Sequence, residues 1–121
     1  MSEIKNSKQY DLEDRCLNFS KSVRIFVKSL PRNISNMEDS KQLVRSSGSV
    51  GANYIEANES LSKKDFVMRI KIARKEAKES IYWLRLLDFS ENESLSEQAD
   101  KLIKECTELM LILSSILRKS E

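Results

Sequence analysis

The sequence predicts an all-α fold, an antiparallel up-down bundle of four helices. The 121-residue chain contains only two glycines and one proline, so a few long helices fit it better than many short strands. Its apolar residues also recur every three or four positions, which is the period of a helix with one buried face. With 40% hydrophobic and 33% charged residues, it has the composition of one folded domain, which we expect over residues 1–121.

The first helix is expected at about residues 11–30. Its apolar side chains are spaced alternately by four and three residues, which places them on one stripe: Leu12, Cys16, Phe19, Val23, Phe26 and Leu30. Pro31 is expected to end the helix, because proline has no N–H to donate and disfavours helical conformation in the preceding residue.

The second helix is expected at about residues 36–61. Ser35 and Glu38 have the spacing of a capping box, which marks a helix start. The helical register then continues through both glycines, because the apolar residues on either side keep one spacing. These residues are Leu43, Val44, Val50, Tyr54, Ile55 and Ala57.

The third helix is expected at about residues 63–87, after a second capping pattern formed by Ser62 and Asp65. The segment DFSENES, residues 88–94, then interrupts the apolar pattern with small polar side chains. The stripe of the third helix contains Phe66, Ile70, Ala73, Ala77, Ile81, Leu84 and Leu87.

The fourth helix is expected at about residues 95–118, after the capping pattern of Ser94 and Glu97. Beside its main stripe it carries a second apolar row. This row is formed by Ile103, Met110 and Leu117. Two interpretations remain open for the row: a wide core-facing stripe, and a second interface between subunits.

The stretch SSGSVGAN, residues 46–53, holds both glycines of the chain. Gly48 and Gly51 share one helix face, and Ser47 and Ala52 widen the patch of small residues. Because such a face lets two helix backbones approach closely, we interpret it as a notch where another helix crosses. A ligand approaching the bare backbone and a helix kink are the alternatives. A Walker loop is excluded, because no Gly-Lys-Ser/Thr element follows.

Charge is distributed unevenly along the chain. Residues 62–87 hold eight Lys or Arg against three Asp or Glu, whereas residues 88–121 hold four against eight. On the third helix a basic ridge lies opposite the apolar stripe. It consists of Lys64, Lys71, Lys75, Lys78 and Arg85, with Met68 and Tyr82 between them. A smaller basic set on the first helix consists of Lys21, Arg24 and Lys28.

Both basic sets are candidate nucleic-acid contacts, because a ridge of cations with an aromatic residue can follow a phosphate backbone. A solvated helix face gives the same pattern. The ridge would also fit the acidic fourth helix of a neighbouring subunit.

Four further polar residues are structural candidates: Asn53, Glu56, Glu76 and Glu79. Paired carboxylates can perform acid–base catalysis when their pKa values are separated. Since no nucleophile, metal ligand or cofactor motif accompanies them, we expect hydrogen bonds to Arg45, Arg74 or helix backbone instead.

The chain contains no histidine, which excludes Ser-His-Asp triads and most transition-metal sites, and we expect no cofactor. Cys16 and Cys106 match no metal or redox spacing and lie on apolar stripes. We interpret them as buried free thiols, with a disulfide or a reactive thiol as alternatives. No run approaches 18 apolar residues and the start lacks a signal-peptide pattern, so we expect a cytoplasmic protein.

The segment from Val44 to Leu87 resembles the signature half of the bacterial four-helix-bundle proteins, also called 23S rRNA intervening-sequence proteins. The matching elements are Ala52-Asn53, Glu56, Ser62-Lys63-Lys64-Asp65-Phe66, Lys75-Glu76-Ala77 and Ile81-Tyr82-Trp83-Leu84. Many members read Ala-Asn-Ile-Ala-Glu-Gly where this chain has Ala-Asn-Tyr-Ile-Glu-Ala, a departure that fits a subgroup. The first and fourth helices resemble the family only in pattern.

This resemblance implies a four-helix protomer that assembles into a homopentameric ring, with no enzymatic activity. Some relatives are encoded within ribosomal RNA genes, and a related branch assists the reverse transcriptase of diversity-generating retroelements and binds nucleic acid. We therefore expect a non-enzymatic protein that binds RNA or DNA, with itself and a reverse transcriptase or another protein as partners. A protein-interaction scaffold that does not bind nucleic acid is the alternative, and an enzyme is a distant third.

Overall fold

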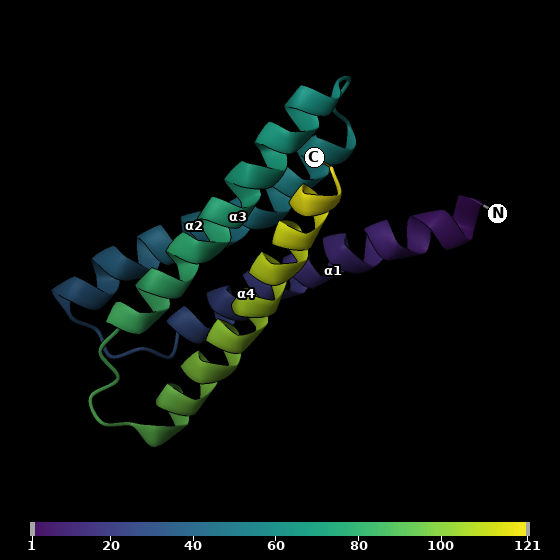
Figure 1. Cartoon of the computed structure of the whole chain (residues 1–121). Coiled ribbons are helices and arrows are strands. Elements are labelled where there is room, and N and C mark those ends of the chain that lie inside the picture. The colour runs from purple at the N-terminus through teal and green to yellow at the C-terminus, as the bar shows by residue number, and fades with distance from the viewer. Residues whose placement is uncertain (1, 121) are drawn as a thin grey trace.

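The computed structural model describes the backbone of residues 2–120 and the side chains of residues 12–120. Four helices and no strand occupy this part of the chain (Figure 1). They are α1 (Ser2–Val27), α2 (Ile34–Asn58), α3 (Lys63–Leu86) and α4 (Glu93–Lys119). The predicted all-helical fold and the predicted number of helices are confirmed.

Each helix packs against its neighbour in the chain, and α1 also packs against α4. The diagonal pairs α1–α3 and α2–α4 do not contact each other within the described residues. In Figure 1, α2, α3 and α4 lie side by side, whereas α1 is inclined to them and its N-terminal turns extend beyond the other helices. The short connections make consecutive helices antiparallel.

The core lies between the four helices and is built from the predicted stripes. Its completely buried aliphatic side chains come from every helix: Val23, Leu43, Val50, Ile70, Leu84, Leu109 and Leu113. Packing of these stripes supplies most of the stability of such helices, since an isolated helix of this length is marginal in water.

Of the three helix starts predicted from capping patterns, two are wrong by two residues. The N-cap of α2 is Asn33, whose side-chain oxygen accepts a 2.8 Å hydrogen bond from the Asn36 N–H, so Ser35 is not the cap. Asn92 likewise caps α4 at Leu95 N–H, in place of Ser94. Asn caps as well as Ser, so spacing alone does not distinguish the two. The cap predicted at Ser62 is confirmed by its bond from Asp65 N–H.

The helix ends also differ from expectation. α1 begins at Ser2, nine residues before the predicted start. Its first turns extend beyond the other helices (Figure 1), where an apolar stripe is not required and spacing gives no signal. It ends at Val27, where a tighter turn begins with a 3.0 Å bond from Ser29 N–H to Phe26 O. α2 ends at Asn58 rather than at residue 61, and Leu61 is fully exposed.

Small side chains pack α2 closely against α3, which is the most extensive helix pair in the structure. Ser46 and Ser80 are completely buried, and their hydroxyl oxygens lie 2.8 Å apart in a hydrogen bond. The Ser80 hydroxyl is also 2.9 Å from Glu76 O. The hydroxyls thus satisfy each other inside the interface, where an unpaired polar group would be costly.

At one end of the molecule, the buried Asn36 side chain joins two connections. Its Nδ2 donates to Pro31 O at 2.9 Å and to Asp88 O at 2.8 Å. Its Oδ1 accepts from Asp88 N–H at 2.9 Å. One side chain therefore holds the α1–α2 connection against the start of the α3–α4 connection.

Candidate nucleic-acid interface

The α3 ridge is exposed along its whole length. Capping at Ser62 sets the start of α3, and its stripe of buried residues, such as Ile70 and Leu84, sets its rotation. All seven predicted positions of the ridge are consequently exposed: Lys64, Met68, Lys71, Lys75, Lys78, Tyr82 and Arg85. None of the five cations has an ion-pair partner among the described residues.

The ridge stays positive because a cation of α2 forms ion pairs with the two carboxylates in the middle of α3. Arg45 of α2 donates from Nη1 to Glu76 Oε1 at 3.4 Å, and from Nη2 to Glu79 Oε2. Glu76 is buried and Glu79 is half-buried, so both face the α2 side of the helix rather than the ridge. The expectation that these carboxylates bond to Arg45 is thus met, whereas no bond of Arg74 is found in the described residues.

The α1 patch, which contains Lys21, Arg24 and Lys28, is also exposed. The Arg24 guanidinium donates to Ser20 Oγ at 3.1 Å. It lies over Gly48 of α2, where an added Cβ would be 3.9 Å from Arg24 Nη2. Arg24 therefore lies close to α2, at a distance that would still accommodate a Cβ atom at position 48.

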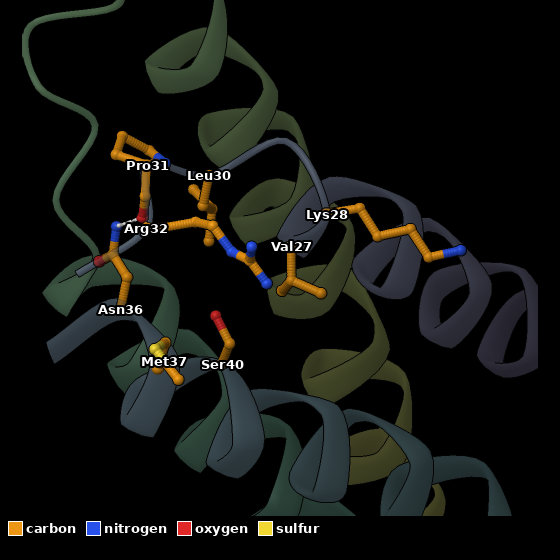
Figure 2. A pocket seen from close by; sticks show the side chains of 8 residues that line it. All are labelled: Val27, Lys28, Leu30, Pro31, Arg32, Asn36, Met37 and Ser40. Carbon is orange, nitrogen blue, oxygen red and sulfur yellow. Dashed lines mark hydrogen bonds between the residues drawn. The ribbon is translucent and has the colours of Figure 1, made fainter. Parts of the chain in front are cut away.

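A cavity of about 490 Å³ continues the α1 patch at the α1–α2 connection (Figure 2). Figure 2 shows the Arg32 guanidinium between Val27 and Ser40, while Lys28 points away from the cavity. Arg32 was missed by sequence reasoning, because it lies in the irregular connection after Pro31 and helical spacing gives no signal there. The basic sets of α1 and α3 are not brought together, since these two helices do not contact each other.

The two glycines have different surroundings. A Cβ added at Gly51 would be 3.0 Å from Cys16 Cβ and 3.9 Å from Cys16 C, so α1 lies directly on this residue. At Gly48 the nearest atom would be Ser20 Oγ at 3.7 Å, which is ordinary contact. The close approach of a second helix is therefore found at Gly51.

The remaining candidate packing residues are dispersed. Asn53 donates to Ser49 O at 2.9 Å and accepts from Arg69 of α3 at 3.2 Å, while Ala52 and Glu56 are exposed. The apolar row of α4 lies at the edge of the core. Leu117 is buried in the core, and Ile103 and Met110 are half-buried and pack against the core. This placement is what a wide core-facing stripe predicts, and a role of the row in assembly stays a prediction.

Both cysteines are free and buried, as expected. Burial raises the pKa of the Cys16 thiol to about 12, and that of the Cys106 thiol also to about 12. The Cys106 thiol donates to Ala77 O at 3.1 Å. Because the thiolate is the nucleophilic form, neither side chain is suited to covalent chemistry at neutral pH.

In the part of the chain that the structure describes, no three His, Cys, Asp or Glu side chains come together in a way that could hold a metal ion. No helix there is long and apolar enough to cross a membrane.

Comparison with known proteins identifies the family of this chain and solved structures that resemble it. Residues 8–115 match the model of the 23S rRNA-intervening sequence protein family. A crystal structure of a protein with unknown function from the S23 ribosomal protein family of Bacteroides thetaiotaomicron VPI-5482 is 34% identical, with a TM-score of 0.76. The match covers 92% of this chain and 98% of that one. Among curated proteins, none matches significantly.

Proposed function

The chain belongs to the 23S rRNA-intervening sequence protein family, and from this premise we propose that it is a non-enzymatic, homo-oligomeric protein that binds nucleic acid through its basic surfaces. The observation that carries the proposal is the α3 ridge, whose five cations are exposed while Arg45 neutralises the neighbouring carboxylates. Unpaired cations along one helix face release counterions from a phosphate backbone, which is the main source of sequence-independent affinity.

Oligomerisation would strengthen this binding. One ridge of five cations offers only a few phosphate contacts, whereas several copies in one assembly act at a high effective concentration. The family resemblance implies five copies in a ring, and a related branch of the family assists a reverse transcriptase. We propose that this protein acts in the cytoplasm as an accessory to such a nucleic-acid enzyme or to another protein. The α1 patch, extended by Arg32, would be a second contact surface on each protomer.

The proposal is tested by fluorescence anisotropy with a structured RNA and a duplex DNA, from about 50 to 200 mM salt. We expect the logarithm of the affinity to fall linearly with the logarithm of the salt concentration. The slope of this line should be about −0.9 for each duplex phosphate that the protein neutralises. The variant Lys71→Glu/Lys75→Glu/Lys78→Glu should lose binding to both ligands.

A matched control carries the same change of charge on another helix. Lys101, Lys104 and Lys119 of α4 are exposed, so Lys101→Glu/Lys104→Glu/Lys119→Glu should retain most of the affinity. If the wild type binds neither ligand at low salt, or if both triple variants lose binding equally, the α3 ridge is not a nucleic-acid interface.

The alternative function is a protein-interaction scaffold, and exposed apolar side chains on α1 and α4 favour it. Leu17 is 51% exposed, Ile25 is 68% exposed and Leu111 is 58% exposed. In this case light scattering would show an oligomer, and neither nucleic acid would bind at low salt. A monomer at micromolar concentration would contradict the ring in both versions of the proposal.

A further inference from the structure

Tyr82 is an exposed aromatic side chain among the cations of the α3 ridge. It is 57% exposed, and Leu86, one turn later, is 48% exposed. Both residues line a surface hollow of about 550 Å³, together with Lys78, Ile81 and Arg85. The hollow therefore presents a phenol ring and an aliphatic side chain to solvent, although the opposite face of the same helix is buried in the core.

Two cations bracket the ring. Lys78 precedes Tyr82 by four residues and Arg85 follows it by three, and residues at these spacings are neighbours on a helix surface. Neither cation forms an ion pair with any residue whose side chain the structure describes. The hollow combines an aromatic surface for stacking with a positive charge on each side, along the helix axis.

We propose that this hollow holds one unstacked base of a single-stranded nucleic acid, with the base on the Tyr82 ring and the adjoining phosphates at Lys78 and Arg85. The inference rests on the proposed function and narrows its ligand class. Inside a duplex both faces of each base are covered by neighbouring bases, so no base face there is available to stack on Tyr82. A single strand can turn a base out and stack it on an aromatic side chain.

The chain contains its own reporter for this site. Trp83 is the only tryptophan, and its ring centroid lies 5.1 Å from that of Tyr82 in an edge-to-face arrangement with an interplanar angle of 70°. Its indole Nε1 is buried and has no hydrogen-bond partner among the described residues. A base that stacks on Tyr82 should therefore change the emission of Trp83.

The experiment compares a single-stranded oligouridylate and a blunt duplex, each about 20 nucleotides long, at the same ionic strength. We expect the single strand to change Trp83 emission on binding. Tyr82→Ala should weaken binding of the single strand roughly tenfold or more and weaken binding of the duplex less than about twofold. Tyr82→Phe should retain the wild-type affinity, because the phenyl face still stacks.

Ile55→Ala removes an apolar side chain of comparable exposure from α2 and should leave both affinities unchanged. Thermal unfolding by circular dichroism checks that each variant is folded. We expect all of them to fold, because the substituted side chains are exposed. Tyr82→Phe keeps the test decisive if Tyr82→Ala is poorly folded, because loss of single-strand binding in the Phe variant would overturn the stacking site.

Three outcomes of the Tyr82→Ala measurement would overturn the inference. Equal losses of affinity for single strand and duplex would mean that Tyr82 maintains the shape of the ridge and does not stack a base. No loss of affinity would mean that Tyr82 does not contact the nucleic acid. A changed oligomeric state in light scattering, with unchanged affinity, would assign the hollow to contact between copies of the chain. The proposed function fails separately, when the wild type binds neither ligand.

Discussion

The pairing of α2 with α3 and the packing of α1 use different kinds of contact. Between α2 and α3 the side chains are small, and the buried hydroxyls of Ser46 and Ser80 bond to each other. α1 contributes large side chains such as Phe19 and Phe26, lies on Gly51, and is tied to α4 at the surface by Arg15.

The difference shows where the molecule tolerates change. α2 and α3 include the segment that resembles the family signature, and their close packing leaves no room for larger side chains. α1 is packed over only part of its length, and its N-terminal turns extend beyond the other helices (Figure 1). We expect substitutions to be costly where backbones lie close together, both between α2 and α3 and at Gly51 beneath α1, and tolerated at surface ion pairs.

Gly51→Leu should have the largest effect, because it removes the close approach of α1. A Cβ at this position is already 3.0 Å from Cys16 Cβ, so a leucine must displace α1. We expect the free energy of unfolding in urea to fall by about 3 kcal/mol or more. Gly48→Ala is the control on the same helix and should raise it by up to about 1 kcal/mol, through better helix propensity. Equal effects of the two variants would contradict the notch at Gly51.

Alkaline pH should have the next largest effect, through the buried thiols of α1 and α4. The folded thiols of Cys16 and Cys106 have pKa values raised to about 12, while the unfolded thiols titrate near 9, so the unfolded state loses two protons first. The thiols should therefore leave stability nearly constant well below pH 9 and lower it as the pH rises toward 12, by up to about 1.4 kcal/mol per thiol for each pH unit.

Urea unfolding between pH 8 and pH 11 measures this slope, and Cys16→Ala/Cys106→Ala should reduce it. Part of the slope should persist in the variant, because burial also raises the pKa of Tyr54. An identical slope in wild type and variant would mean that the thiols are accessible to solvent in the folded protein.

Ser80→Ala probes the α2–α3 pair with a smaller change. It removes the partner of the Ser46 hydroxyl, which keeps only a 3.4 Å bond to Leu43 O. We expect a loss of about 1–2 kcal/mol in thermal or urea unfolding, the usual cost of a buried polar group left poorly bonded. Ser46→Ala/Ser80→Ala should lose less than the sum of the single variants, whereas additive losses would show that the hydroxyls act independently.

Arg15→Ala should have the smallest effect, although Arg15 forms the shortest described bond between α1 and α4, at 2.7 Å to Glu105. The two side chains are 39% and 32% exposed, so solvent screens their attraction. We expect a loss of about 0.5 kcal/mol at low salt that disappears in concentrated salt. Lys41→Ala, which breaks a still more exposed pair with Glu38, should change nothing measurable. A large, salt-independent loss for Arg15→Ala would place this pair in the core.

Most of the fold could be predicted from the sequence, because helical periodicity is local. The stripe from Leu12 to Leu30 is buried as expected. The α3 ridge is exposed because it lies opposite a stripe that can be identified from spacing alone. The start of α1 could not be predicted from its stripe, since an apolar stripe marks only the part of a helix that packs against something.

The site was less predictable than the fold. Arg32 extends the α1 patch from the irregular connection between α1 and α2, where no periodic pattern exists to indicate it. Arg45 forms ion pairs with Glu76 and Glu79 only because of the way α2 and α3 are rotated about their axes. Arg45 and Arg74 had both been candidates, and only the packed pair of helices distinguishes them.

By itself, the sequence determined the number and order of the helices, the side chains of the core and the position of the basic ridge, because each depends on residues within one helix. The tertiary structure decided which glycine meets α1, which carboxylates Arg45 neutralises and which polar residues cap α2 and α4. These features depend on contacts between distant segments or on a choice between neighbouring residues of equal propensity. Only packing of the complete chain makes that choice.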